Sequence, residues 1–211
     1  MKVLVTGFEP FGGEKINPSW EAVKALPGEI SGAEVVKHRL PVTFNGVRKI
    51  LPRLIVEEKP DVVVLTGQAG GRPNITVERV AINVMDSKMP DNEGVTQEDE
   101  PVFDGAPAAY FATLPIKAIV RALRNAGIPA SVSNTAGTYV CNTAMFTALH
   151  TIAVAGMEAR AGFVHVPFSH AQALDKPRPS MAQETIDEAI KRVVEVSIGG
   201  DLGHSSLKSI S

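Results

Sequence analysis

The sequence predicts an α/β fold in which helices cover a mainly parallel, twisted β-sheet. Short apolar runs alternate with longer segments of helical character, which is the pattern of βα units. Two of these runs end alike, Val5-Thr6-Gly7 and Leu65-Thr66-Gly67, as expected for strands that stop at a glycine turn. The chain has 211 residues, 44% of them hydrophobic, and this size fits one core. We therefore expect a single domain over residues 1–198 and a frayed tail over 199–211.

Six segments are expected to form strands because they are short apolar runs bounded by turn residues. They are residues 2–7, 33–40, 61–67, 75–84, 130–133 and 162–166. Pro167 ends the last of them, since proline has no N–H for the strand ladder. Residues 85–109 are rich in proline, glycine and acidic side chains, and this composition predicts a long loop.

Five segments are expected to be helical, namely residues 19–26, 44–58, 115–126, 139–154 and 179–198. Pro18 suits the first turn of the first helix, where its missing N–H has no helical partner. Gly127 and Pro129 end the third helix. Pro52 should kink or split the second helix, because an interior proline removes one hydrogen bond and clashes with the preceding turn.

The composition excludes several classes of protein. The net charge of -2, without a block of like charges, argues against a nucleic-acid partner. One cysteine forms neither an internal disulfide nor a multi-cysteine zinc site, which is compatible with a reducing cytoplasm. No apolar run is long enough for a signal peptide or a membrane span, and no His, Asp and Glu cluster has the spacing of metal ligands. We expect a soluble cytoplasmic protein without metal or cofactor.

Ligands of open α/β sheets bind beyond the carboxyl ends of the strands. Four segments follow expected strands directly and are therefore candidates: residues 8–13, 68–72, 134–141 and 165–170. The glycine-rich parts of the first two could hold a phosphate. However, they match neither G-x-x-x-x-G-K-[ST] nor G-x-G-x-x-G, so tight turns are the favoured interpretation.

Cys141 is the only cysteine and lies in the first turn of the expected helix 139–154. The positive end of the helix dipole and the free N–H groups favour a thiolate there, which is the nucleophilic form. The alternative is a buried cysteine that packs as a small hydrophobic residue.

A nucleophilic cysteine needs a histidine within hydrogen-bond reach. His165 is the best candidate, because it lies near the end of its expected strand on the same face as Phe163. His150 follows Cys141 by nine residues, roughly 13 Å along the helix axis, and is placed on the polar side of that helix. The other histidines are expected in a strand, a loop and the tail: His38, His170 and His204. A structural role for His165, bonded to backbone, stays open.

Glu78 is the acid best placed to orient the imidazole. It falls on the apolar face of its expected strand, where a carboxylate is costly unless it is paired. The alternative is an ion pair with Arg72 or Arg79. Asn142 and Asp86 are weaker candidates for the orienting group.

With these residues identified, the chain resembles the pyroglutamyl peptidase (pyrrolidone-carboxylate peptidase) family of cysteine peptidases. Four segments carry the resemblance: TGFEPFGG at 6–13 with Asn17-Pro18, GQAGGRPNITVERVAIN at 67–83, PDNEG at 90–94 and SNTAGTYVCN at 133–142. GFVHVPF at 162–168 and LPIK at 114–117 add to it, and the similarity runs from residue 2 to about 196. It implies a single three-layer α/β/α sandwich, often assembled as a homotetramer.

The resemblance also implies a reaction and its residues. A Cys-His-Glu triad, here Cys141, His165 and Glu78, removes an N-terminal 5-oxoproline from peptides through a thioester, without metal or cofactor. The implied substrate-binding residues are Phe8 and Phe11 against the ring, with Gln68 and the backbone around Val140 as hydrogen-bonding partners.

The resemblance also bears on two residues outside the triad and the ring site, Asn17 and Lys88. Asn17 is expected to tie down the phenylalanine loop. Lys88 stands where family members often carry an arginine near the oxyanion site, and lysine lacks the planar fork of that side chain.

Two other classes of function are weighed against the peptidase. A phosphate- or nucleoside-binding enzyme, such as a nucleoside phosphorylase, would use the glycine loops and would not need Cys141. A binding protein that has lost catalysis would be expected to lack one member of the triad, and all three are present.

Overall fold

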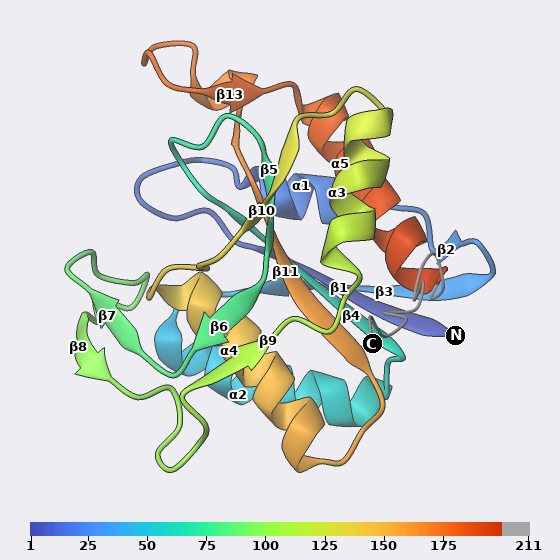
Figure 1. Cartoon of the computed structure of the whole chain (residues 1–211). Helices are drawn as coiled ribbons and strands as arrows, with labels where there is room; N and C mark the ends of the chain where they lie inside the picture. Colours follow the sequence, from blue (N-terminus) through green and yellow to red (C-terminus); the bar gives the residue numbers. More distant parts are fainter. Residues whose placement is uncertain (200–211) are drawn as a thin grey trace, which may run out of the picture.

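A twisted sheet between two layers of helices organises the computed structural model, which describes residues 1–199 (Figure 1). Seven strands of this part of the chain form the sheet, in the order β10-β5-β11-β4-β1-β3-β2. Their bounds are β1 Lys2–Phe8, β2 Glu29–Ile30, β3 Ala33–Leu40, β4 Val62–Gln68, β5 Ile75–Glu78, β10 Ala130–Ser133 and β11 Arg160–Val166. The helices are α1 Pro18–Ala25, α2 Phe44–Glu58, α3 Ile116–Asn125, α4 Val140–Val154 and α5 Gln183–Ile198. The expected α/β class and its layers are confirmed.

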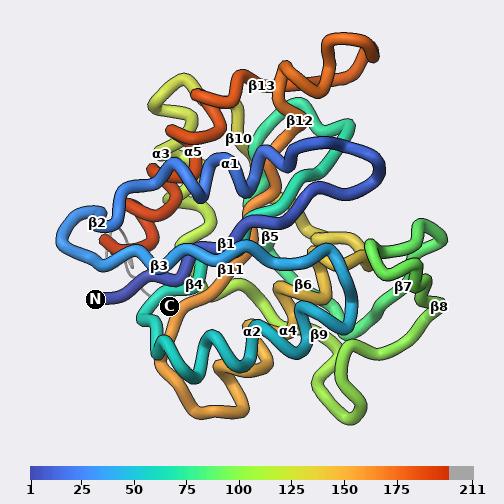
Figure 2. The backbone as a smooth tube through the Cα atoms, turned by 180° about the vertical axis from the view of Figure 1, so that it is seen from behind, coloured from blue at the N-terminus to red at the C-terminus, as the bar shows by residue number. Residues whose placement is uncertain are grey.

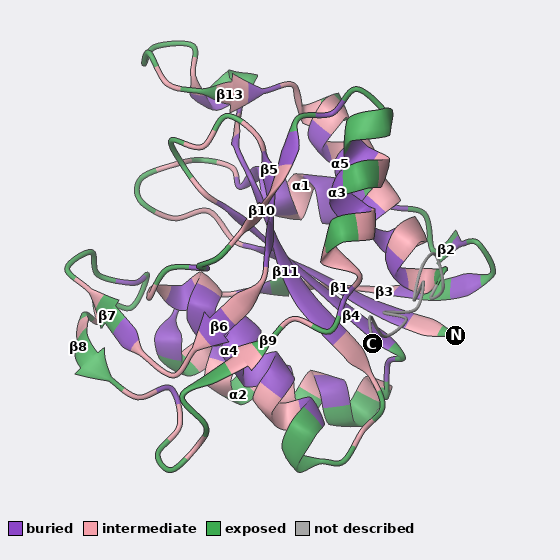
Figure 3. Cartoon of the chain, viewed as in Figure 1, coloured by how far each residue is buried: buried purple, intermediate pink, exposed green. Residues whose placement is uncertain are grey.

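The helices divide between the two faces of the sheet. Helices α1, α3 and α5 pack together on one face, and α2 packs with α4 on the other (Figures 1 and 2). Alternate residues of the buried strands supply two separate cores, so that Val64 and Val164 face the first layer while Leu65 and Phe163 face the second. Figure 3 shows the central strands largely buried between the two helical layers. The same alternation directs Gly67 and His165 toward α2 and α4, as the sequence predicts for His165.

The direction of the strands positions the site. Strands β3, β1, β4 and β11 run parallel, whereas β5 runs antiparallel to β11 and parallel to β10. The candidate segments that follow β1, β4 and β11 therefore lie at one edge of the sheet, as expected. The segment 134–141 follows β10, which runs the opposite way, yet it brings Cys141 beside Gly67 near the end of β4. The reversed β5 instead carries Glu78 back along β11, into the interior.

Several expected elements have other bounds. Residues 75–84 divide into β5 and β6 (Val80–Ile82), and β6 leaves the main sheet to pair with β9 (Ala109–Phe111). The expected loop 85–109 contains a short hairpin of β7 (Met85–Ser87) and β8 (Gln97–Glu100). Helix α5 begins at Gln183, because the residues before it form β13 (Ser180–Met181) beside β12 (Phe168–Ser169). The sequence pattern misses these pairings because each involves segments of only two to four residues.

Two helices also differ from expectation. Helix α2 continues through Pro52 without a break, with Leu51 and Ile55 buried on either side of it. Helix α4 has no polar side near His150, because Thr143 and Thr147 are fully buried. Among residues 1–199, no helix is long and apolar enough to cross a membrane. The predicted tail lies outside the described residues, except for Gly199, which ends α5.

Candidate active site

Cys141 is a free thiol in the first turn of α4, as the sequence predicts. The residue before the helix, Tyr139, has an extended backbone, and no side chain of the described chain caps the helix start. The first hydrogen bond of the helix runs from the N–H of Thr143 to the carbonyl of Tyr139, at 3.2 Å. The N–H groups of Val140, Cys141 and Asn142 therefore have no partner within the helix. Three backbone donors accompany the thiol.

The thiol lies against the end of β4. A Cβ atom built on Gly67 would be 3.0 Å from Sγ of Cys141, so the sulfur occupies the space that a larger residue would fill. His165 is the register partner of Gly67 on the neighbouring strand β11, and its side chain emerges on the same face. Strands are about 4.8 Å apart, so the imidazole and the thiol lie on the same face of the sheet, on either side of Gly67. Phe163 supports the imidazole from below, with 4.7 Å between the ring centroids.

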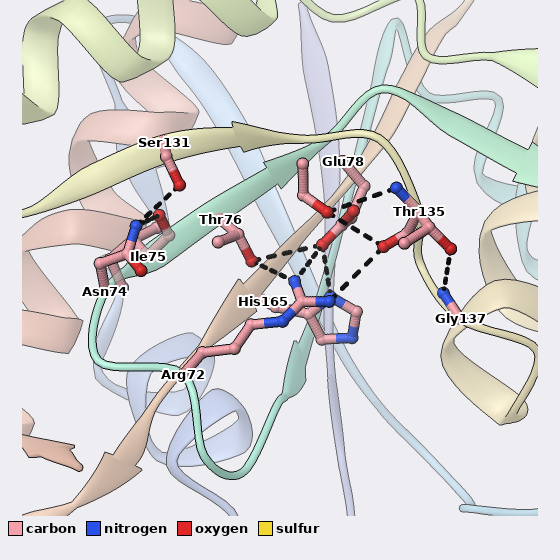
Figure 4. A network of polar contacts seen from close by, with 10 residues as sticks. Arg72, Asn74, Ile75, Thr76, Glu78, Ser131, Thr135, Gly137 and His165 are labelled. Carbon is pink, nitrogen blue, oxygen red and sulfur yellow. Dashed lines mark hydrogen bonds and ion pairs between the residues drawn. The ribbon is translucent and has the colours of Figure 1, made fainter.

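The imidazole is held by a buried carboxylate (Figure 4). Nδ1 of His165 is 2.8 Å from Oε1 of Glu78, and both residues are buried. A carboxylate that accepts this bond places the proton on Nδ1 and leaves Nε2 free to accept one. The geometry is that of a histidine base and its orienting acid.

Arg72 binds the same carboxylate oxygen. Its Nη1 donates to Oε1 of Glu78 at 2.7 Å and to the hydroxyl of Thr76 at 2.6 Å. Thr76 in turn donates to Oε1 at 3.3 Å. Both interpretations of Glu78 are thus realised together, since it orients the imidazole and pairs with an arginine. Arg79, the other candidate for the ion pair, donates instead to the side chain of Asn134.

Burial and charge set the protonation states of the site. Burial alone raises the pKa of Glu78, but its bonds to His165 and Arg72 bring that pKa below the ordinary value. Burial lowers the pKa of His165 and outweighs the opposing effect of Glu78, so the imidazole is neutral at pH 7. Burial, with the charge of Glu78, raises the pKa of Cys141 to about 12. The expectation of a resting thiolate is therefore wrong, and the thiol needs His165 as its base.

Two phenylalanine rings and Val140 share an apolar cluster with Cys141. Phe8, the last residue of β1, is buried with its ring centroid 6.4 Å from that of Phe163. Phe11, from the loop that follows, is half-buried at 6.3 Å from the ring of Tyr139. Val140 is buried immediately before Cys141. All three side chains thus belong to, or pack against, the apolar cluster against which Cys141 also packs.

Asn17 and Lys88 lie at the margins of the site. Asn17 caps α1 by accepting from the N–H of Ser19 at 3.1 Å, and it donates to the carbonyl of Glu9 at 3.0 Å, so it holds the Phe11 loop. Lys88 is exposed in the turn after β7 and makes no hydrogen bond or ion pair with the described residues. That turn is attached to the start of α4, because the hydroxyl of Tyr139 donates to the carbonyl of Pro90 at 3.0 Å.

A pair of glutamines fixes the direction of a donor at the end of β4. The N–H of Ser169 donates to Oε1 of Gln172 at 3.0 Å, which leaves Nε2 of Gln172 to donate to Gln68 at 2.9 Å. Gln68 must accept with its oxygen, so its own Nε2 is a free donor with respect to the described residues. The sequence analysis missed Gln172. Its signal was the capping-box spacing of Ser169 and Gln172.

The other candidates serve structural roles. Asn142 binds the backbone of Ile82 and Val84 and does not contact His165. His150 is bonded through Nδ1 to the hydroxyl of Tyr110 at 3.0 Å. Asp86 lies on β7 and His38 on β3, and neither is bonded to Glu78. His170 begins a short 3₁₀ helix (His170–Gln172) and is bonded to Ser180. His204 lies outside the described residues. Within residues 1–199, no three His, Cys, Asp or Glu side chains are grouped to hold a metal ion.

Comparison with known proteins identifies close relatives. A sequence profile described as pyroglutamyl peptidase matches residues 1–199. The chain is 77% identical to the pyrrolidone-carboxylate peptidase of Thermococcus onnurineus, over 94% of this chain and 99% of the relative. Two solved structures are similar. A mutant pyrrolidone carboxyl peptidase of Pyrococcus furiosus is 47% identical with a TM-score of 0.92, over 94% of this chain and 99% of that one. The pyroglutamyl peptidase I of Bacillus amyloliquefaciens is 43% identical with a TM-score of 0.91, over 94% and 97%.

Proposed function

Because the chain belongs to the pyroglutamyl peptidase family, we propose that it removes N-terminal 5-oxoproline residues from peptides, with Cys141 as nucleophile. The observation that carries this proposal is the position of the Cys141 thiol, which lies against Gly67 beside an imidazole held by a buried carboxylate. The thiol, base and orienting acid come from three separate elements, α4, β11 and β5, and they converge on one face of the sheet.

The proposed reaction proceeds in two halves. Nε2 of His165 takes the proton of the thiol as the sulfur attacks the carbonyl carbon of the 5-oxoprolyl residue. The oxyanion that forms accepts hydrogen bonds from the free N–H groups at the start of α4, with Cys141 among them. The imidazolium then protonates the departing amine, which leaves a thioester. Water gives a proton to His165 and attacks the thioester, releasing 5-oxoproline and restoring the thiol.

The chemistry of the substrate fits the proposed binding residues. A 5-oxoprolyl end has no charged amine, and its ring presents an apolar edge and one amide. Phe8 and Phe11 supply apolar contact for the ring, and the free Nε2 of Gln68 supplies a donor for the lactam carbonyl. Proline lacks that carbonyl and glutamate carries a charged amine, so both would bind less well. Lys88 lies two residues before Pro90, whose carbonyl accepts from Tyr139, and we assign it no step in the reaction.

We propose further that the protein works in the cytoplasm as a homotetramer. The single free cysteine suits a reducing compartment, and the tetramer rests on the family resemblance. Light scattering of the purified protein tests the subunit count, and a monomer at assay concentration would refute it.

The proposed activity is tested by hydrolysis of a pyroglutamyl amide that carries a chromophore, beside the matching prolyl and glutamyl compounds. We expect cleavage of the pyroglutamyl compound alone, lost after alkylation of Cys141 and unaffected by a metal chelator. A folded protein that cleaves none of the three would overturn the proposal. Full activity in Cys141→Ser would instead favour an enzyme that does not use the thiol, such as a nucleoside phosphorylase.

A further inference from the structure

Arg72 connects three parts of the site. It comes from the loop between β4 and β5, and its guanidinium reaches Glu78 and Thr76 on β5 (Figure 4). Its second nitrogen, Nη2, donates at 3.5 Å to the carbonyl of Thr135, in the segment that leads to Cys141. The side chain of Arg72 is 31% exposed, whereas that of Glu78 is completely buried. The guanidinium therefore covers the carboxylate on its solvent side.

The charges of the site balance only when Arg72 is included. At rest, the carboxylate of Glu78 and the guanidinium of Arg72 sum to zero, beside a neutral thiol and imidazole. After the proton moves from Cys141 to His165, the cluster holds two negative and two positive charges. Without Arg72, the thiolate would form beside a carboxylate whose charge is compensated only by the new imidazolium. Like charges in a buried site are strongly unfavourable.

We propose that Arg72 is a positioning residue that acts as the counter-charge of Glu78, so that the orienting carboxylate does not oppose ionisation of Cys141. This inference rests on the proposed function only in that Cys141 must ionise to act. It explains why one carboxylate oxygen accepts from both His165 and Arg72: a single negative charge then orients the base while its field on the sulfur is cancelled. The two charges act on the thiol in opposite directions, as the proposal requires. Glu78 raises the pKa of Cys141, and Arg72 lowers it.

Other charged or titratable groups on neighbouring elements make no hydrogen bond or ion pair with Glu78 among the described residues. They are Arg48 on α2, Arg79 after β5, Asp86 on β7, Asp91 after the β7 turn, Tyr110 on β9 and Tyr139 before α4. Arg48 lies over the ring of Phe103, and Tyr110 is bonded to His150. Asp91 accepts from the backbone of Phe44. Burial raises the pKa of Tyr139 to about 12, so it is neutral at pH 7. Among the described residues, the two cationic or basic partners of Glu78 are thus Arg72 and His165.

The test is the rate at which iodoacetamide alkylates the protein between pH 6 and pH 9. Because the sequence has one cysteine, this rate reports on Cys141 alone and needs no substrate. We expect Arg72→Gln to lower the rate at pH 7 about tenfold, the effect of a rise of one unit in the thiol pKa. Arg72→Lys keeps the charge and should stay within about threefold of the parent protein. The matched control is Arg79→Gln, which removes a neighbouring cation without touching Glu78 and should leave the rate unchanged.

A double variant separates charge compensation from a structural role. In Glu78→Gln/Arg72→Gln the uncompensated carboxylate is gone, and the amide oxygen can still accept from Nδ1 of His165. We expect its alkylation rate to recover most of the loss seen in Arg72→Gln. This variant also serves if Arg72→Gln does not fold. Parent-like alkylation by folded Arg72→Gln, or no recovery in the double variant, would overturn the inference. Failure of the proposed peptidase activity would leave the alkylation result interpretable.

Discussion

Substitution of Gly67 by alanine tests whether catalysis depends on the space that the thiol and the Phe163 ring occupy beside β4. The strand backbone at Gly67 has no positive φ, so alanine introduces no backbone strain. Its Cβ, however, would lie 3.0 Å from Sγ of Cys141 and 2.8 Å from Cζ of Phe163. Both distances are several tenths of an ångström shorter than ordinary contacts between such atoms. The sulfur and the aromatic ring must therefore move, and the ring supports the imidazole of His165.

The expected size of the effect follows from these two contacts. Overpacking of a filled interior costs typically 1–3 kcal/mol, so we expect the free energy of unfolding to fall by about 2 kcal/mol. A displacement of about 1 Å between nucleophile and base can lower the rate about 100-fold, so we expect kcat/KM to fall by at least that factor. Gly28 provides the matched control, because nothing lies within 4 Å of a Cβ built there. Gly28→Ala should change neither quantity.

The assay pairs turnover of the pyroglutamyl amide with denaturant unfolding of the same preparations. Adding Phe163→Leu to Gly67→Ala removes the ring atom in closest contact, so part of the lost stability should return. Turnover should not return, because the contact with Sγ remains. Parental kcat/KM in Gly67→Ala would refute the reasoning, since it would mean that the sulfur does not need the space above β4.

Three further expectations concern the triad, the binding amide and pH. Cys141→Ser or His165→Ala should lower turnover by orders of magnitude, while circular dichroism and the melting temperature stay close to those of the parent. Glu78→Gln should lower turnover less, because an amide oxygen can still accept from Nδ1 of His165. Parental turnover in any of these variants would assign that residue's role to another group. In Gln172→Glu the new carboxylate cannot donate to Gln68, so the Gln68 amide should reverse and present its oxygen to the lactam carbonyl. We therefore expect KM to rise about tenfold. An unchanged KM would contradict the assigned direction of the Gln68 amide. Because the folded thiol has a raised pKa, its contribution to stability is complete below the unfolded pKa of about 8.5 and is lost as pH rises toward about 12. Relative to Cys141→Ser, the parent protein should therefore lose unfolding free energy above about pH 9, and parallel curves would show that the folded thiol titrates normally.

Much of the fold could be predicted because it depends on local patterns. The bounds of β3 and α2 follow from apolar periodicity and turn residues, and Cys141 at a helix start follows from the small residues before it. The division between β5 and β6 could not be predicted, because the alternation of apolar residues continues through Arg79. The reversed direction of β5 is a long-range property, because it depends on pairing with β11, which follows far later in the sequence.

The members of the site could be predicted, but not their electrostatics. Cys141 could be singled out as the only cysteine, at a helix start, and His165 and Glu78 by strand phase, since each is a polar group among apolar residues. The pKa of the Cys141 thiol could not be predicted, because it depends on how deeply the sulfur is buried and on its distance to Glu78. The sequence also offered an ion pair and a triad as alternatives for Glu78, whereas one oxygen takes part in both.

The start of α4 lacks a side-chain cap, so under the proposed mechanism the bound substrate would supply the missing acceptor. A side-chain acceptor can complete the first turn of a helix, and removing such a cap costs about 1 kcal/mol. Tyr139 supplies no side-chain acceptor at the start of α4, so the N–H groups around Cys141 have no partner within the helix. The oxyanion of the intermediate would complete that turn, so the helix is least stable in the empty enzyme and most stable when bond breaking is under way. A natural cap at this position would strengthen the fold and compete with every substrate.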